Sequence, residues 1–252
     1  MDFNYKKPTH IFALLLIIVS ILFVIILPMI SFIGAFSSSE SSDAETIENM
    51  SRNAKLFFEI FVLMVQFAFT FILMVLFPVI WYLVVNNCSI KGIFTRLQLT
   101  KKDIDKVIIW GFLTAVLMFA ISYISTIIFI SSGVDSEELG NVQDLEVYFS
   151  PVSILILVAV QPIAEEIFFR GFLYDKIRSY KGDALAITLT AILFGLAHIS
   201  YNKPYVVLST IAIGFVLGYA VFKTKNLYSS IFAHTLYNVA VIVLYYLAKS
   251  YI

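Results

Sequence analysis

The chain has 252 residues, of which 60% are hydrophobic and only 13% are charged, and its net charge is zero. A soluble domain carries about 25% charged residues, so this composition excludes an ordinary soluble fold and indicates long apolar helices in a lipid bilayer. The balanced charge gives no reason to expect nucleic acid as a partner, and the single cysteine excludes an internal disulfide.

Seven apolar segments have the length of a membrane span. The predicted fold class is therefore all-α, a polytopic transmembrane helical bundle of about seven spans, with an eighth left open. The first segment is too long for the core of a signal peptide, so we expect it to stay as an anchor. The predicted spans cover residues 11–36, 56–86, 107–130, 151–171, 184–200, 205–222 and 227–248.

No composition change marks off a soluble domain, so residues 1–252 are predicted to form a single integral membrane domain. Residues 1–150 hold N-terminal spans without a recognisable signature. Residues 151–248 hold the polar residues that could carry chemistry, and we expect them to form the catalytic core.

The connecting loops indicate the orientation. The stretch 37–50 is rich in serine and acid and is predicted to be a loop, and 131–150 contains acids but no Lys or Arg. Most of the 17 Lys and Arg residues fall in the N-terminal segment and in the loops on the other side of the membrane from 37–50 and 131–150. The positive-inside rule then predicts a multi-pass protein of the cell membrane with a cytoplasmic N-terminus and an outer C-terminus.

Two adjacent glutamates, Glu165 and Glu166, lie inside the predicted span 151–171, where a carboxylate costs about 2.5–3.5 kcal/mol on insertion scales. Glu166 and Arg170 are four residues apart with the acid first, the favoured order for an ion pair within a helix. Glu165 is turned about 100° away, because an α-helix has 3.6 residues per turn. We therefore expect Arg170 or a neighbouring helix to hold Glu166, and Glu165 to point into a cavity.

Two of the three histidines lie in the C-terminal spans. His198 closes the sequence Phe194-Gly-Leu-Ala-His198, and His234 lies one helical turn before Asn238 on the same face. Counting about 1.5 Å per residue from the span ends predicts similar depths for Glu165 and His234 and a greater depth for His198. These groups could be polar contacts between helices, but an acid pair with an arginine and two histidines favours a functional site.

Chemically, the set suits hydrolysis. A carboxylate in an apolar site is a stronger base than one in water and can take a proton from a water molecule. Histidine and asparagine can orient that water, pass a proton or donate hydrogen bonds to an oxyanion. Glu165, His198 and His234 could instead hold zinc as three protein ligands with a water in the fourth position, and residue types alone do not separate these alternatives.

Three other features are predicted to be structural. Gly214-Phe-Val-Leu-Gly218 is typical of close helix packing, and Pro162 loosens the helix that carries the glutamates. Asp175 and Asp183 flank a hydrophilic stretch and are poor candidates for an intramembrane aspartyl pair.

The ordered motifs Glu165-Glu166-x-x-x-Arg170, Phe194-x-x-x-His198 and His234-x-x-x-Asn238 resemble those of the type II CAAX prenyl endopeptidase-like family. This family is also called CPBP or Abi, for CAAX proteases and bacteriocin-processing enzymes. The resemblance covers about a third of the chain. Each motif alone is short, and the order of all three in apolar helices makes the resemblance specific.

The resemblance implies an intramembrane endopeptidase whose catalytic residues are Glu165, Glu166, Arg170, His198, His234 and Asn238. Glu165 would act on the water while His198 shares the proton transfer, and His234 and Asn238 would stabilise the oxyanion near the cytoplasmic face. Zinc stays open as a cofactor, because the family has been described both as metalloproteases and as metal-independent glutamate proteases. The implied partners are peptide or protein substrates, either prenylated proteins or leader and bacteriocin peptides.

Two other functions fit the same residues. A non-catalytic immunity or scaffold protein of the same family would bind a peptide or partner in the cavity. A proton-coupled transporter would use the carboxylates and histidines as a relay. The sequence sets no oligomeric state.

Overall fold

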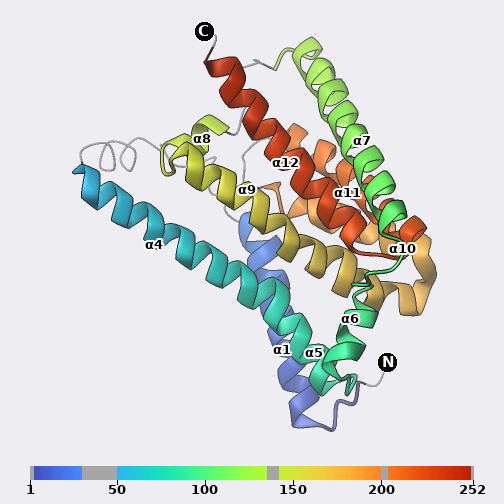
Figure 1. Ribbon diagram of the computed structural model, residues 1–252. Helices are drawn as coiled ribbons and strands as arrows, with labels where there is room; N and C mark the ends of the chain where they lie inside the picture. The colour runs from blue at the N-terminus through green and yellow to red at the C-terminus, as the bar shows by residue number, and fades with distance from the viewer. Residues whose placement is uncertain (1–2, 30–49, 135–141, 200–203, 251–252) are drawn as a thin grey trace.

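The computed structural model describes residues 3–29, 50–134, 142–199 and 204–250, and every regular element in these ranges is helical (Figure 1). The predicted all-α membrane bundle is confirmed. The predicted loop 37–50 and the end of the first predicted span lie almost entirely outside the described residues. The elements are α1 (Pro8–Ile21), η1 (Leu22–Ile26), α4 (Arg52–Phe71), η2 (Ile72–Leu76), α5 (Phe77–Val84), α6 (Ile90–Arg96), α7 (Ile104–Ser131), α8 (Val142–Glu146), α9 (Pro151–Glu166), η4 (Ile167–Leu173), α10 (Tyr174–Leu196), α11 (Pro204–Thr224) and α12 (Tyr228–Lys249).

Within the described ranges, six helical segments are long and apolar enough to cross a membrane. The number differs from the seven predicted spans because Pro151–Leu196 forms one continuous segment of 46 residues. That segment contains the predicted span 151–171 and most of the predicted span 184–200.

The chain nevertheless reverses inside this segment. Gly182 has φ +82° and ψ 175°, a non-helical conformation that glycine adopts without strain. The rings of Phe169 and Phe194 lie 5.3 Å apart, whereas a straight helix at 1.5 Å per residue would separate them by about 38 Å. The second half of α10 therefore packs back against η4, and this reversal brings the second sequence motif to the first.

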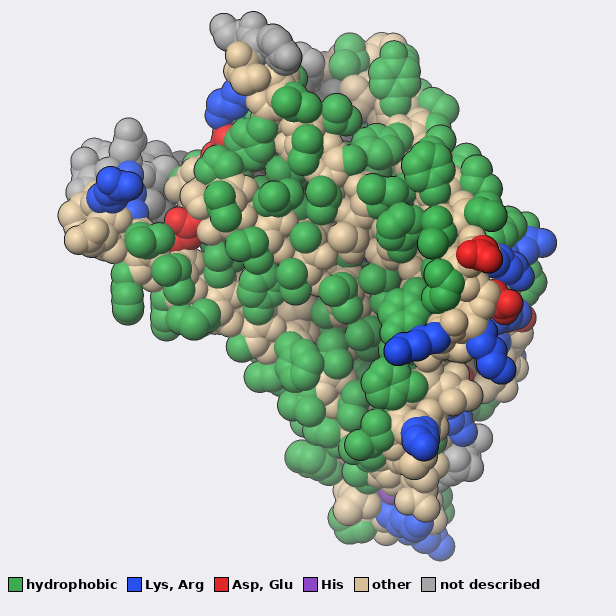
Figure 2. Space-filling view, in the orientation of Figure 1, with side chains coloured by type: hydrophobic (Ala, Val, Ile, Leu, Met, Phe, Trp, Pro, Cys, Tyr) green, Lys and Arg blue, Asp and Glu red, His purple; other side chains and the backbone are tan. Residues whose placement is uncertain are grey.

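The core forms where η4 meets its neighbours. Phe168, Phe169 and Phe172 are fully or almost fully buried, and Phe172 makes edge contacts with the rings of Trp81 and Tyr82 of α5. The outer faces of the helices are apolar and exposed, as Figure 2 shows on one side of the molecule. This pattern suits a bundle whose outer surface contacts lipid.

The loops that carry most of the basic residues lie at one end of the bundle. Asp175 accepts hydrogen bonds from Tyr82 and Lys176, and Arg96 lies 3.8 Å from the same carboxylate. Asn226 donates its side-chain amide to the backbone of Thr100, so the loops before α7 and α12 meet here. Most Lys and Arg side chains in Figure 2 follow this edge.

The opposite end carries α8 and the end of α12. Lys249 donates hydrogen bonds to Glu146, and Glu59 of α4 accepts one from the backbone amide of Ser150 at the start of α9. In the predicted loop 131–150, residues 135–141 lie outside the described ranges. Helices from both predicted parts of the chain, 1–150 and 151–248, pack together throughout the bundle, and the division between them stays a prediction.

Candidate active site

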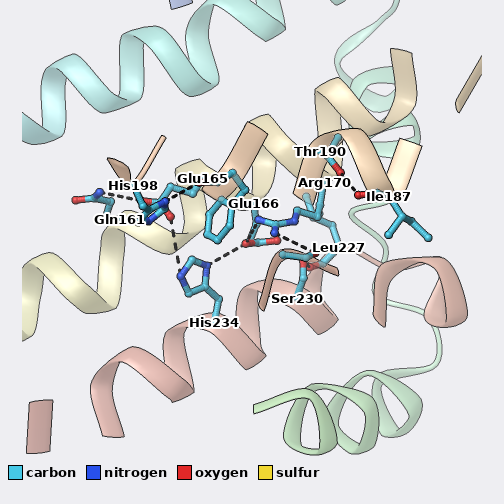
Figure 3. A network of polar contacts seen from close by, with 12 residues as sticks. Gln161, Glu165, Glu166, Arg170, Ile187, Thr190, His198, Leu227, Ser230 and His234 are labelled. Atoms are coloured by element: carbon cyan, nitrogen blue, oxygen red, sulfur yellow. Dashed lines mark hydrogen bonds and ion pairs between the residues drawn. The ribbon is translucent and has the colours of Figure 1, made fainter. Parts of the chain in front are cut away.

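The two glutamates end helix α9 and point in different directions. Directly after Glu166 the helix widens into the π-helical segment η4, a variation that is frequent at functional sites. Figure 3 shows Glu165 on one side of α9 and Glu166 turned towards Arg170. The prediction that Glu166 and Glu165 face different surroundings is confirmed, because the two carboxylates have different partners.

Glu166 belongs to a buried ion pair. Its Oε1 atom lies 2.8 Å from Nη1 of Arg170, and both side chains have no exposed surface. Arg170 also donates to the carbonyl oxygen of Gly214 at 3.3 Å, and its guanidinium lies 4.1 Å from the ring centroid of Phe194. The arginine therefore links α11 and the second half of α10 to the helix that carries the glutamates.

Glu166 also fixes His234. Nδ1 of His234 lies 2.9 Å from Oε1 of Glu166, and because a carboxylate only accepts, Nδ1 carries the hydrogen. Nε2 of His234 then faces Glu165, at 3.9 Å from its Oε2 atom. In the singly protonated ring this Nε2 is an acceptor, so a donor role requires a proton on both ring nitrogens.

Glu165 is almost buried, with 6% of its surface exposed. Its Oε1 atom accepts a hydrogen bond of 2.8 Å from the amide of Gln161, one turn earlier. The 3.9 Å gap between Glu165 and His234 is too long for a direct hydrogen bond and is a place where a water molecule can contact both groups.

His198 follows the end of α10 and is fixed by its own turn. Its Nδ1 lies 2.7 Å from the carbonyl oxygen of Phe194, which only accepts, so the lone pair of the ring lies on Nε2. The ring of Phe194 packs against both imidazoles, with centroids 4.6 Å from His198 and 5.7 Å from His234. His198 lines the same cavity as Glu165, so counting along the predicted span overestimated the difference in depth between these two residues.

A cavity of about 590 Å³ brings the predicted residues together. Glu165, His198, His234 and Asn238 all line it. It runs from Glu165 between α7, α9, α11 and α12 to Val142 and Leu145 of α8, at the end opposite the basic loops. Its walls mix aromatic and aliphatic side chains with hydroxyls, a lining typical of ligand sites.

The structure places all six predicted site residues in one neighbourhood, four on the cavity and two, Glu166 and Arg170, behind it. Two features were not identified from the sequence. Gln161 donates a hydrogen bond to Glu165, and the ring of Phe194 packs against His234. The spacing of four between Gln161 and Glu165 was the available signal. Gly214 was predicted to pack closely and does so, since a Cβ there would lie 2.9 Å from the backbone of Ala191.

The described residues contain no group of three or more His, Cys, Asp or Glu side chains arranged so that they could hold a metal ion. Nδ1 of His234 is occupied by Glu166 and Nδ1 of His198 by a carbonyl, so only one nitrogen of each ring could face a metal. Carboxylate and carbonyl partners on the second ring nitrogen are usual for metal-binding histidines, so the zinc set stays a prediction, and we derive no step through a metal.

The fold is that of a multi-pass membrane protein, and its interior holds a carboxylate, two imidazoles and two amides beside one cavity. Residues 148–240 match the family described as "Type II CAAX prenyl endopeptidase Rce1-like", which confirms the predicted resemblance. The chain is also 28% identical over 112 residues to "Putative membrane peptidase YdiL" of Bacillus subtilis (strain 168), in an alignment that spans 44% of each protein. No solved structure matches the chain.

Proposed function

We propose that the protein is an intramembrane endopeptidase that cleaves a peptide bond with a water molecule activated by Glu165. The observation that carries the proposal is the 3.9 Å separation between Glu165 and Nε2 of His234 at a shared cavity. The match of residues 148–240 to an endopeptidase family supports it.

In the proposed reaction, Glu165 takes a proton from the water and the water oxygen attacks the carbonyl carbon of the peptide. The carbonyl oxygen becomes an oxyanion in a tetrahedral intermediate. The carbon–nitrogen bond then breaks, and the amine leaves with the proton, which Glu165 returns directly or through Nε2 of His198. The products are a carboxylic acid and an amine, so one water is consumed for each bond.

Asn238 and His234 are proposed to stabilise the oxyanion. The Asn238 amide can donate in any protonation state. His234 can donate from Nε2 only with both ring nitrogens protonated, because Glu166 already takes the hydrogen on Nδ1. Asn238 is therefore the more direct donor, and Glu166 and Arg170 act by positioning His234.

The shape of the cavity suggests how a substrate lies. His234 is two turns from the start of α12, at the basic end, whereas the cavity extends towards α8 at the other end. We propose that the scissile bond lies near the cytoplasmic face and that a membrane-embedded part of the substrate fills the cavity. A lipidated protein or a hydrophobic leader peptide has this form, and the host membrane would be the cell membrane with the N-terminus in the cytoplasm.

The test compares membranes of cells that produce the wild type, Glu165→Gln or the control Glu146→Gln, by quantitative mass spectrometry of membrane peptides. Peptides that accumulate as products with the wild type and the control should be absent with Glu165→Gln. Unchanged products in a correctly inserted Glu165→Gln variant would refute the proposal. Protection against a peptide toxin that persists in that variant would support a binding protein instead, and activity lost on chelation would support zinc as a cofactor.

A further inference from the structure

Glu165 lies in a wall between two cavities. A second cavity of about 270 Å³ lies on the other side of α9, and Gln161, Glu165 and His198 line both. The remaining lining of the second cavity comes from the N-terminal spans and from Phe169 and Ala197. The proposed base therefore faces two separate spaces, although its reaction needs two reactants, a peptide and a water.

The second cavity has a polar wall that the sequence does not explain. Gln66 and Thr70 of α4 lie one helical turn apart and both line it. They belong to a 33-residue apolar span. An amide or hydroxyl without a hydrogen-bond partner raises the free energy of the protein in such surroundings. Thr70 is buried, whereas Gln66 is exposed where it lines the cavity. Neither side chain makes a hydrogen bond to another residue in the described part of the chain, so water is the partner that would satisfy them.

We propose that this second cavity is a water chamber that supplies the hydrolytic water to Glu165, and that Gln66 and Thr70 hold the water there. A water molecule takes about 30 Å³ in the liquid, so a cavity of about 270 Å³ has room for several. In this proposal the peptide substrate binds in the larger cavity. This inference rests on the proposed function and gives the N-terminal spans, which lie outside residues 148–240, a part in the reaction.

The first test measures whether the chamber is wet, independently of cleavage. In a Cys88→Ser background, which removes the single native thiol, Thr70→Cys and Gln66→Cys are treated in membranes with Ag⁺. The chain is then denatured, and the remaining thiols are labelled with a maleimide. Phe71→Cys is the matched control, because Phe71 is the next residue and is 54% exposed on the apolar outer surface.

A thiol in water ionises and reacts, whereas a thiol in lipid stays protonated. Ag⁺ should therefore react with Thr70→Cys and Gln66→Cys about tenfold faster or more than with Phe71→Cys. Equal and slow reaction of all three thiols would show a dry or lipid-filled cavity and would overturn the proposal. Two chamber positions are used so that one variant that fails to fold does not decide the result.

The second test is kinetic. Gln66→Leu and Thr70→Val remove the polar groups with little change in size, and each should lower kcat about tenfold while KM stays unchanged, because the water reacts but the peptide still binds. A rise in KM with unchanged kcat would assign the second cavity to the substrate and contradict the proposal. If Glu165→Gln still cleaves while the Ag⁺ result is as expected, the chamber is wet but the proposed function is wrong.

Discussion

The ion pair between Glu166 and Arg170 allows a quantitative prediction for Arg170→Met. Methionine keeps much of the length and apolar surface of the arginine but removes its charge. The change breaks the 2.8 Å contact with Glu166 and the bond to the Gly214 carbonyl, and it removes the cation from the ring of Phe194. Glu166 then stays buried without a cationic partner on its own helix, and only neutral or weakly basic groups such as the imidazole of His234 remain near it.

The magnitude follows from the burial of both partners, which have no exposed surface. Removing one member of such a pair costs about 3–5 kcal/mol, because an uncompensated charge is left inside. In a protein of this size, 1 kcal/mol corresponds to roughly 2–4 °C in Tm. We expect Arg170→Met to lower Tm by about 10 °C, and the displaced His234 should remove cleavage as well.

The double variant Glu166→Gln/Arg170→Met tests the cause. It removes both charges, and the glutamine carbonyl can still accept from Nδ1 of His234, so it should unfold at a higher temperature than Arg170→Met alone. Thermal unfolding of the three proteins in one detergent, followed by the fluorescence of the two tryptophans, measures this difference. A Tm of Arg170→Met within about 2 °C of the wild type would refute the reasoning.

Three further predictions concern packing, catalysis and pH. Gly214→Ala should cost about 1–3 kcal/mol, measured by Tm, because its Cβ would lie 2.9 Å from the backbone of α10; Gly218→Ala, whose Cβ would lie 3.2 Å from a side chain, should cost less. Asn238→Leu should lower kcat about 10²-fold or more with little change in Tm if the amide stabilises the oxyanion, and an unchanged kcat would exclude that role. The hydrogen bonds from Lys249 hold the pKa of Glu146 below its usual value, so the small stability they supply is complete above about pH 4.3 and is lost as the pH falls further. Lys249→Met should remove this part of the pH dependence of Tm, and a profile identical to that of the wild type would contradict it.

Much of the fold followed from the sequence because the bilayer restricts the choices. A span needs about 20 apolar residues and must satisfy its backbone internally, so helices at the predicted places were the expected solution. The Glu166–Arg170 pair was also predictable, since residues four apart in a helix are neighbours whatever the tertiary structure. The sequence order of three short motifs was enough to indicate the resemblance to the family, and the match of residues 148–240 confirms that resemblance.

Contacts between distant segments needed the tertiary structure. The sequence predicted two spans on either side of residue 182, but it did not show that Gly182 makes the reversal or how α10 packs after it, so counting residues from the start of the predicted span 184–200 placed His198 too deep. The bond from Glu166 to Nδ1 of His234 decides which ring nitrogen faces Glu165, and residue types carry no such information. The second cavity, with Gln66 and Thr70, likewise arises only when α4 packs beside α9.

The amino-acid order alone thus determined which segments enter the membrane and which polar groups they carry, because both depend on local hydrophobicity and helical spacing. Tertiary packing decided which atoms of those groups meet, because a hydrogen bond between spans depends on tilt, rotation and reversal of whole helices. The proposed chemistry therefore depends on the separation of Glu165 from the two imidazoles, which only the packing of the helices sets.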